Sequence, residues 1–334
     1  MQSPAPYIRT FILGIIASVG LTATAHAQLT VDVDNSGSEE LVIAVPGLPT
    51  PQNVDTPAGN TAELGAKISD VIVTDLRSSG LFKPVGRNQV RGISFSEVTA
   101  PQFPYWSGTN ASALIQGFIK TNPDGKLTVG CYLYDVALET ELTRQGFVVE
   151  PRDWRRAAHK CADAIYSRLS GESPFFDSRI AYIAETGPKG NRVKRLAIMD
   201  SDGANHRFIT NGQATALTPR FSPDYKSIVY LSFLDGNPRI YIYDIGTGRQ
   251  RLITQSTNPT FAPRWSPDGK RLLTNSWQDE APTWAPNGRV IQFFRTTRGN
   301  GATGIWQVDL TGSNERQLPT PVNGSDPAWG PLLP

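Results

Sequence analysis

A short motif repeated along the C-terminal half of the chain restricts the possible folds more than any other feature. Its pattern is a proline, a variable residue, an aromatic residue, a small residue and a second proline. Copies follow Thr218, Ala262, Ala281 and Asp326. In three copies the second proline precedes Asp or Asn, and two of these continue with Gly. Each copy therefore predicts a strand that ends in a tight turn, since Pro presets φ and Gly accepts a positive φ.

The spacing of the motif defines the repeating unit. Pro219 and Pro263 lie 44 residues apart, and Pro282 and Pro327 lie 45 residues apart. Four antiparallel strands with a period of about 44 residues are typical of a β-propeller blade. After the first strand of the unit that begins at Thr218, the remaining strands are predicted at residues 228–231, 240–243 and 251–254.

The two ends of the repeat array complement each other. The first unit has a second, a third and a fourth strand, at residues 179–183, 194–200 and 207–210, but no first strand. Residues 326–330 form a first strand without a unit of its own. Pairing of these two parts would close the ring of blades, and the length of the remaining units leaves open whether it does.

One unit is too short to make a blade. Pro263 and Pro282 are only 19 residues apart, because Lys270 runs directly into Arg271 where the other units insert about two strands. Residues 271–274 are predicted to be the outermost strand of this unit. The array then holds about three full blades and one stunted blade, whereas propellers normally close with four to eight blades.

Residues 41–173 follow a different pattern, which predicts a small α/β domain. Apolar residues at helical spacing predict helices at 62–79 and 153–169, and Gly171 stops the second helix. The predicted strands cover residues 41–45, 113–119 and 127–136, and a Pro-Asp-Gly turn joins the last two. The fold class is therefore an α/β domain followed by an all-β propeller at residues 174–334.

The first 27 residues are typical of a secretory signal peptide. Arg9 precedes a short apolar run, which is followed by Ala25-His26-Ala27, and cleavage is predicted between Ala27 and Gln28. A membrane anchor needs about 20 apolar residues and this run is shorter. Removal of residues 1–27 takes away one of the 32 basic side chains and leaves a net charge of +1. That balance argues against a nucleic-acid partner, and we expect a soluble mature protein.

The two cysteines allow either a disulfide or two buried thiols. Cys161 lies on the apolar stripe of the predicted helix that also carries Ala158 and Ile165, and Cys131 lies in an apolar strand. Export would permit a disulfide. Buried free cysteine behaves as a small hydrophobic residue, and we favour two core thiols here.

The sequence gives little indication of a catalytic site or a metal site. Hydrolases that carry a propeller need a G-x-S-x-G nucleophile motif, which is absent from the sequence. The only histidines beyond the predicted signal peptide are His159 and His206, and both are expected to be solvated. Two His and two Cys also lack zinc-ligand spacing. The Asp32-x-Asp34 start of a calcium loop meets Ile43 where a glutamate is required. We therefore predict a protein without enzymatic activity, metal or cofactor.

The signal peptide, the α/β domain, the Trp-Ser-Pro-Asp-Gly repeats and the sequence Asp-Pro-Ala-Trp-Gly-Pro-Leu-Leu at 326–333 together resemble the TolB family of the Tol-Pal system. The resemblance implies a periplasmic adaptor with a six-bladed propeller. It implies binding to the peptidoglycan-associated lipoprotein Pal through the propeller, and to the inner-membrane protein TolA through residues 28–40. It further implies a role in outer-membrane integrity and in constriction at cell division. A stable homo-oligomer is not expected, so we predict a monomer.

Two sets of residues are predicted to bind these partners. The N-terminal segment alternates in a way that suits strand addition to a partner's sheet, although an edge strand of the protein's own first domain fits equally well. Its candidate residues are Leu29, Val31, Val33 and Asp34. The loops before each repeat proline are expected to ring the propeller opening. Their candidates are Leu217, Thr218, Pro259, Thr260, Phe261, Ala262, Asp279, Glu280, Ala281 and Asp326.

Two other functions were weighed. One is a propeller related to prolyl-oligopeptidase-like hydrolases, which the missing nucleophile motif disfavours. The other is a propeller that binds sugar or peptidoglycan through exposed aromatic side chains such as Trp277 and Trp306, although packing within the blades explains these residues as well. Peptidoglycan binding in the absence of Pal would distinguish this second function from the adaptor.

Overall fold

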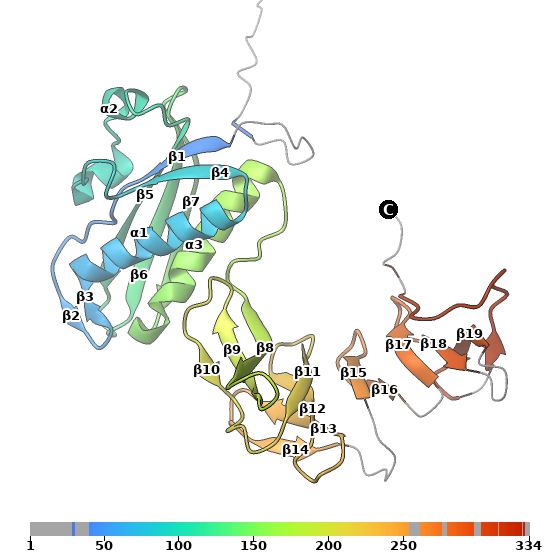
Figure 1. Ribbon diagram of the computed structural model, residues 1–334. Helices are drawn as coiled ribbons and strands as arrows, with labels where there is room; N and C mark the ends of the chain where they lie inside the picture. Colours follow the sequence, from blue (N-terminus) through green and yellow to red (C-terminus); the bar gives the residue numbers. More distant parts are fainter. Residues whose placement is uncertain are drawn as a thin grey trace, which may run out of the picture.

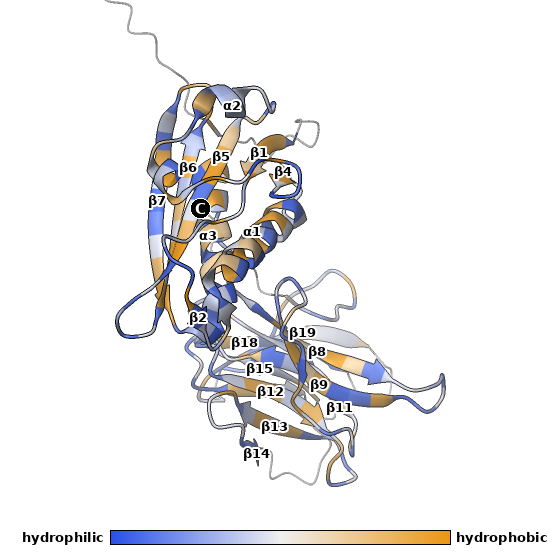
Figure 2. Ribbon diagram, turned by 90° about the vertical axis from the view of Figure 1, so that its left-hand side faces the viewer, coloured by the Kyte–Doolittle hydropathy of each residue, from blue (hydrophilic) through white to orange (hydrophobic). Residues whose placement is uncertain are grey.

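The structure is a computed structural model, and it describes residues 29–30, 40–253, 261–275, 279–296, 302–312, 314–328 and 330. It contains an α/β domain and a row of small antiparallel sheets (Figure 1). Apolar residues gather where the helices pack on the large sheet and along the inner strands of the small sheets (Figure 2). No helix in these ranges is long and apolar enough to cross a membrane.

A five-stranded sheet in the order β4-β1-β5-β6-β7 forms the α/β domain. Its parallel part places β1 (Leu41–Val45) between β4 (Phe82–Gly86) and β5 (Ala113–Thr121). β6 (Leu127–Asp135) and β7 (Thr140–Val149) follow antiparallel, and β7 is an edge strand. The predicted hairpin is confirmed, since a tight turn joins β5 to β6, whereas β4 and β7 were not predicted. A small hairpin, β2 (Asp55–Thr56) with β3 (Gly59–Asn60), leads into the first long helix.

Two helices cover one face of this sheet, α1 (Thr61–Ser78) and α3 (Trp154–Ser170) (Figure 1). Their buried apolar stripes meet the sheet in the main hydrophobic core, because residues three and four apart lie on one helix face. The opposite face is covered by the 3-10 helix η1 (Phe95–Thr99) and by α2 (Phe103–Ser107), whose Trp106 is fully buried. A second 3-10 helix, η2 (Pro151–Asp153), leads into α3.

The N-terminus of α1 is capped by Asn60, whose side-chain Oδ1 accepts a hydrogen bond from the Ala62 N–H at 2.9 Å. We expect Asn60→Ala to lower the free energy of unfolding by about 1 kcal/mol, because one helix donor then loses its partner. Urea denaturation followed by circular dichroism measures the change. Asn60→Ser is the control, since serine caps equally well and, unlike aspartate, adds no charge beside Asp55, which accepts a hydrogen bond from the Asn60 amide at 3.0 Å.

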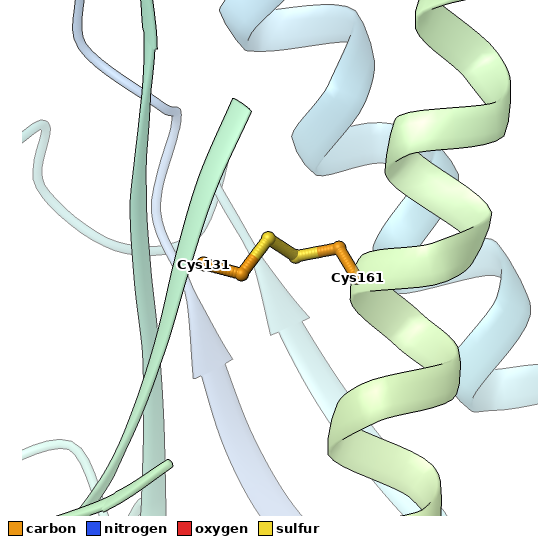
Figure 3. Close-up of a disulfide and its surroundings, with 2 residues drawn as sticks. All are labelled: Cys131 and Cys161. Atoms are coloured by element: carbon orange, nitrogen blue, oxygen red, sulfur yellow. A yellow bond between two sulfur atoms is a disulfide. The ribbon is translucent and has the colours of Figure 1, made fainter. Parts of the chain in front are cut away.

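Cys131 on β6 and Cys161 on α3 form a disulfide (Figure 3). The preference for two core thiols was therefore wrong. Their Cα atoms lie 6.0 Å apart, within the usual range for a disulfide. Both residues are buried, as expected, but the helix packs so close to the sheet that the two sulfur atoms meet. The bridge fixes α3 to the strand that it covers.

The connection between the domains is held by a carboxylate of α3. Gly171 ends the helix with a φ of 75°. Asp163 then accepts hydrogen bonds from three successive backbone N–H groups, those of Phe175, Phe176 and Asp177, at 2.9, 2.7 and 3.0 Å. Because an ionised carboxylate accepts strong hydrogen bonds, this linker is tied to the helix rather than left as a free tether.

The first two units of the repeat array have the predicted strands. The first is a three-stranded sheet of β8 (Arg179–Thr186), β9 (Val193–Asp200) and β10 (Arg207–Phe208). Next comes a complete blade in the order β11-β12-β13-β14. Its strands are β11 (Ala216–Phe221), β12 (Ser227–Ser232), β13 (Arg239–Asp244) and β14 (Gln250–Leu252). Apolar residues of β9 pack against β12 and β13, so the two units share one core.

The stunted unit is a two-stranded sheet of β15 (Phe261–Trp265) and β16 (Leu272–Asn275). The prediction that residues 271–274 form an outermost strand was wrong. Without an intervening pair of strands, β16 folds back over the turn and takes the second-strand position beside β15. Trp265 and Leu272 pack against the preceding blade.

The last unit is again a complete blade. Its sheet order is β17-β18-β19-β20, with β17 at Asp279–Trp284, β18 at Val290–Thr296, β19 at Thr303–Asp309 and β20 at Arg316–Gln317. The pairing that would close the ring is not observed among the described residues. Residues 326–328 are not in a strand, and the last blade lies away from β8 in Figure 1. The array is a partial propeller with an open ring.

Candidate functional site

The residue before each repeat proline has an unusual backbone conformation. Thr218, Ala262, Ala281 and Asp326 have φ values of 47°, 46°, 46° and 51°. The left-handed region costs a residue with a side chain about 1–2 kcal/mol. A following proline normally holds the preceding residue in an extended conformation. The same costly bend therefore recurs at four equivalent places in the chain.

Each of the first three bends interrupts the pairing of a first strand with its second strand. The register shifts between Leu217 and Arg220, and at the equivalent places in the β15–β16 and β17–β18 pairs. A bulge of this kind turns the strand and redirects its side chains. Backbone strain of this type clusters at binding sites. The starts of the first strands are therefore the strongest candidate for a partner-binding face.

The side chains around these bends differ in exposure. Phe261 is 43% exposed, which is high for a phenylalanine. Thr218, Glu280 and Asp326 are exposed, whereas Ala262 and Ala281 are half-buried. Leu217, the equivalent of Phe261, packs against the core of its own blade.

The structure places some predicted residues and leaves others out. Pro259 and Thr260 lie outside the described residues, and only the backbone of Asp279 is described. Asp326 has the same bend but lies in a segment that is not part of a sheet. Sequence reasoning located these loops through the repeat. It did not predict their left-handed conformation.

The opposite end of the first strands carries the predicted tight turns. The Gly269 N–H donates to Ser266 O at 2.9 Å, and Gly269 has a φ of 69°. A Cβ placed on Gly269 would lie 3.5 Å from the ring of Pro223 in the preceding blade. Gly288 packs in the same way against Pro267. These contacts connect successive units at the turn end.

The predicted N-terminal binding segment is described only in part. Leu29 packs against the main core of the α/β domain. This contact supports the alternative in which the segment belongs to its own first domain. Val31, Val33 and Asp34 lie outside the described residues, as do the predicted cleavage residues Ala27 and Gln28.

A buried charged cluster joins the two domains, and sequence reasoning missed it. His159 on α3 was expected to be solvated but is only 2% exposed, and that expectation was wrong. Its Nδ1 lies 2.7 Å from Oδ2 of Asp75 on α1, which is 1% exposed. Asp202, in the turn after β9, brings a third potential ligand atom within 4.8 Å of the other two. Asp75 and His159 are 84 residues apart, so no local pattern could have indicated the pair.

The cluster is arranged as a hydrogen-bonded interface. The Arg155 guanidinium donates to Oδ2 of Asp202, while Oδ1 of Asp202 accepts the Ala204 N–H at 3.0 Å. Burial lowers the pKa of His159, but the hydrogen bond that His159 donates to Asp75 and the negative charge of Asp75 outweigh this effect, so the pKa of His159 is raised. Burial also raises the pKa of Asp75. Because both pKa values are raised, each group keeps its proton to a higher pH than it would in water.

A cleft of about 1210 Å³ lies beside this cluster, between α3, the linker and the first repeat units. Arg156, Lys160 and Arg168 of α3 line one side, and Phe221 and Tyr225 line another. Arg156 forms a salt bridge with Asp177, with 3.0 Å between Nη2 and Oδ2. The cleft separates the two domains on one side, while the buried charged cluster joins them on the other.

Comparisons with known proteins agree with this two-part architecture. Residues 29–142 match the model of the TolB amino-terminal domain, and residues 166–275 match that of the TolB beta propeller domain. The Tol-Pal system protein TolB of Zymomonas mobilis is 45% identical, and the alignment covers 92% of this chain and 91% of that protein. The Tol-Pal system protein TolB 1 of Novosphingobium aromaticivorans is 48% identical, with 90% and 92% covered.

A solved structure and the lengths of the alignments locate the difference from these relatives. The crystal structure of TolB from Acinetobacter baumannii is similar with a TM-score of 0.59 and 25% identity, covering 88% of this chain. The chain spans only 64% of that solved chain. The alignment with the Zymomonas protein has 417 positions, more than the 334 residues of this chain. The relatives therefore carry internal residues that this chain lacks, in agreement with the shortened unit at Lys270.

Proposed function

The chain belongs to the TolB family of the Tol-Pal system, and on that premise we propose that it is a periplasmic adaptor that binds other proteins. The proposed partners are a Pal-like lipoprotein at the propeller and a TolA-like inner-membrane protein at residues 28–40. The proposed role is to support outer-membrane integrity and constriction during division. The two predicted binding regions belong to different domains, which suits an adaptor between two partners.

The recurring left-handed bend is the observation that carries the propeller part of this proposal. Three equivalent bends, at Thr218, Ala262 and Ala281, lie near the start of the first strand in three successive units. The exposed aromatic ring of Phe261 lies directly beside one of the bends. Aromatic side chains dominate the binding energy of many protein interfaces. A strained, repeated loop with an exposed aromatic residue supports a protein-binding face.

The absence of enzymatic activity is part of the same proposal. The sequence contains no G-x-S-x-G motif. His159 faces a carboxylate, as the base of a hydrolytic triad would, but its Nε2 atom has no hydrogen-bond partner among the described residues. A triad would present a serine or cysteine nucleophile there. His159 is also 98% buried by the chain itself, which supports a structural role.

Calorimetric titration with soluble Pal tests the propeller face. We expect the mature protein to bind, and we expect Phe261→Ala to weaken binding by about 30-fold, the equivalent of about 2 kcal/mol for a central aromatic residue. Tyr225→Ala is the matched control, because Tyr225 is 63% exposed but lies in the turn at the opposite end of its first strand. Equal losses in both variants, or no binding of the folded protein, would contradict the proposed face.

A further inference from the structure

The first unit of the array has an unpaired strand edge. β8 pairs with β9, and within the described part of the chain no strand occupies its other edge. In the complete blades the equivalent edge is occupied by a first strand, β11 beside β12 and β17 beside β18. Ile180 on β8 is 40% exposed. An uncovered edge with apolar side chains is a template for pairing with another strand.

Residues 324–328 contain the bend of a first strand, but apart from a hydrogen bond from the Gly324 N–H to Thr303 O of β19 at 3.2 Å they pair with no strand in the described part of the chain. Asp326 has a φ of 51°, close to the 46–47° of the residues that begin β11, β15 and β17 at the same repeat position. The following Pro327 matches the repeat prolines. Yet residues 325, 326 and 328 are exposed, and residues 324–328 are not in a sheet. The segment therefore has the bend of a first strand although it is not paired with a second strand.

The register of the missing pair follows from the other units. The residue after each repeat proline lies opposite a fixed position of the second strand: Arg220 opposite Val229, and Thr283 opposite Gln292. The stunted unit keeps the same rule, with Arg264 opposite Leu273. Three independent units therefore agree on one register.

The third strands locate the equivalent position on β8. Asp244, the last residue of β13, lies opposite Ser227, and Val229 follows two residues later. Asp200, the last residue of β9, lies opposite Arg179 in the same way. The position that matches Val229 is therefore Ala181. The missing first strand would accordingly place Ala328 opposite Ala181.

We propose that residues 324–328 of one chain dock on β8 of a second copy of the same chain, and that the exchange is mutual. Within one chain the last blade lies apart from β8, because the array is a short arc (Figure 1). The described part of the array has four sheets, one of only two strands, so one chain lies at or below the minimum for closure and two chains together supply eight. A two-fold exchange covers the open β8 edge of both chains in one closed, symmetric arrangement. This inference goes beyond the proposed function and departs from the monomer expected from the sequence.

A designed disulfide tests both the register and the exchange. Residues directly opposite in an antiparallel pair have Cα atoms about 4.5–5.5 Å apart, within disulfide range. We expect the double variant Ala181→Cys, Ala328→Cys of the mature chain to give a covalent dimer on a non-reducing gel after mild oxidation. Mixing the two single variants should give the same dimer, while each single variant alone should remain a monomer band. The native disulfide is buried and does not compete.

The matched control moves one cysteine along β8. Ala184→Cys with Ala328→Cys shifts the partner by three residues and to the other face of the strand, so we expect little cross-linking. Light scattering of the unmodified chain should give twice its mass. A cross-link inside a single chain would show that the ring closes on itself and would overturn the proposal. A monomer by light scattering without any cross-link would overturn it equally. Neither result depends on whether Pal binds.

Discussion

Replacing Cys131 and Cys161 together by alanine is expected to lower the stability of the α/β domain by about 3–4 kcal/mol. The bridge spans a sequence separation of 30 residues, and closing a loop of that length removes about this much conformational free energy from the unfolded chain. Both side chains are buried, so alanine leaves a cavity at each position. Each cavity is only about the size of one sulfur atom and adds little to that loss. The change is large because a domain of ordinary stability has only about 5–15 kcal/mol to lose.

Urea denaturation, followed by hydrogen exchange of peptides from β6 and α3, measures this loss within the α/β domain. Peptides from β12 and β13 are the internal control, since the bridge lies in the other domain. The wild-type protein treated with reductant under partly denaturing conditions should approach the double variant. A double variant within about 0.5 kcal/mol of the wild type would show that the bridge adds nothing to the packing of α3 on the sheet.

The second large effect is expected at the buried pair of Asp75 and His159. Asp75→Ala leaves His159 buried without its charge partner, and removal of one member of a buried pair costs about 3–5 kcal/mol. Replacing both residues by leucine removes the uncompensated charge together with its partner. We therefore expect the double variant to recover a large part of the loss. Equal destabilisation in the single and the double variant would contradict an electrostatic cause.

The pair should also give the protein a pH-dependent stability. The pKa of His159 is raised in the folded protein, mainly because Asp75 and Asp202 outweigh the effect of burial and of the Arg155 charge. A raised pKa contributes stability that is complete below the unfolded value of about 6.5. This contribution is lost as the pH rises through the folded value. Thermal midpoints measured from pH 5.5 to 9 should fall more steeply for the wild type than for the double leucine variant.

Local chemistry explains which parts of the fold could be predicted from the sequence. The blades were predicted because Pro, Asp and Gly determine their turns within a few residues, and Gly269 shows the expected positive φ. The long helices were predicted from their apolar stripes. The disulfide was not, because it depends on how closely α3 packs against β6. β16 was assigned to the wrong strand position because pairing depends on which neighbour is available, and the shortened unit leaves β15 as its partner.

The candidate site was predictable in position and not in conformation. The repeat locates the loops at Thr218, Ala262 and Ala281, but proline favours an extended residue before it, so their left-handed backbone runs against the local preference. Only the tertiary arrangement of the blades explains it. The buried cluster was hidden for another reason, since Asp75, His159 and Asp202 come from three distant segments. Asp75 and His159 meet when α1 packs beside α3, and Asp202 joins them only when the two domains meet.

The three hydrogen bonds that Asp163 accepts determine how the molecule carries mechanical load. A pull between one partner on the α/β domain and another on the propeller passes through the linker and through the contact of Arg155 with Asp202. Because three successive backbone groups of the linker bond to one carboxylate of α3, tension in the linker reaches the helix through several bonds at once. Bonds loaded together resist more force than bonds loaded in sequence. We therefore expect the linker to act under tension as a stiff coupling between the two domains.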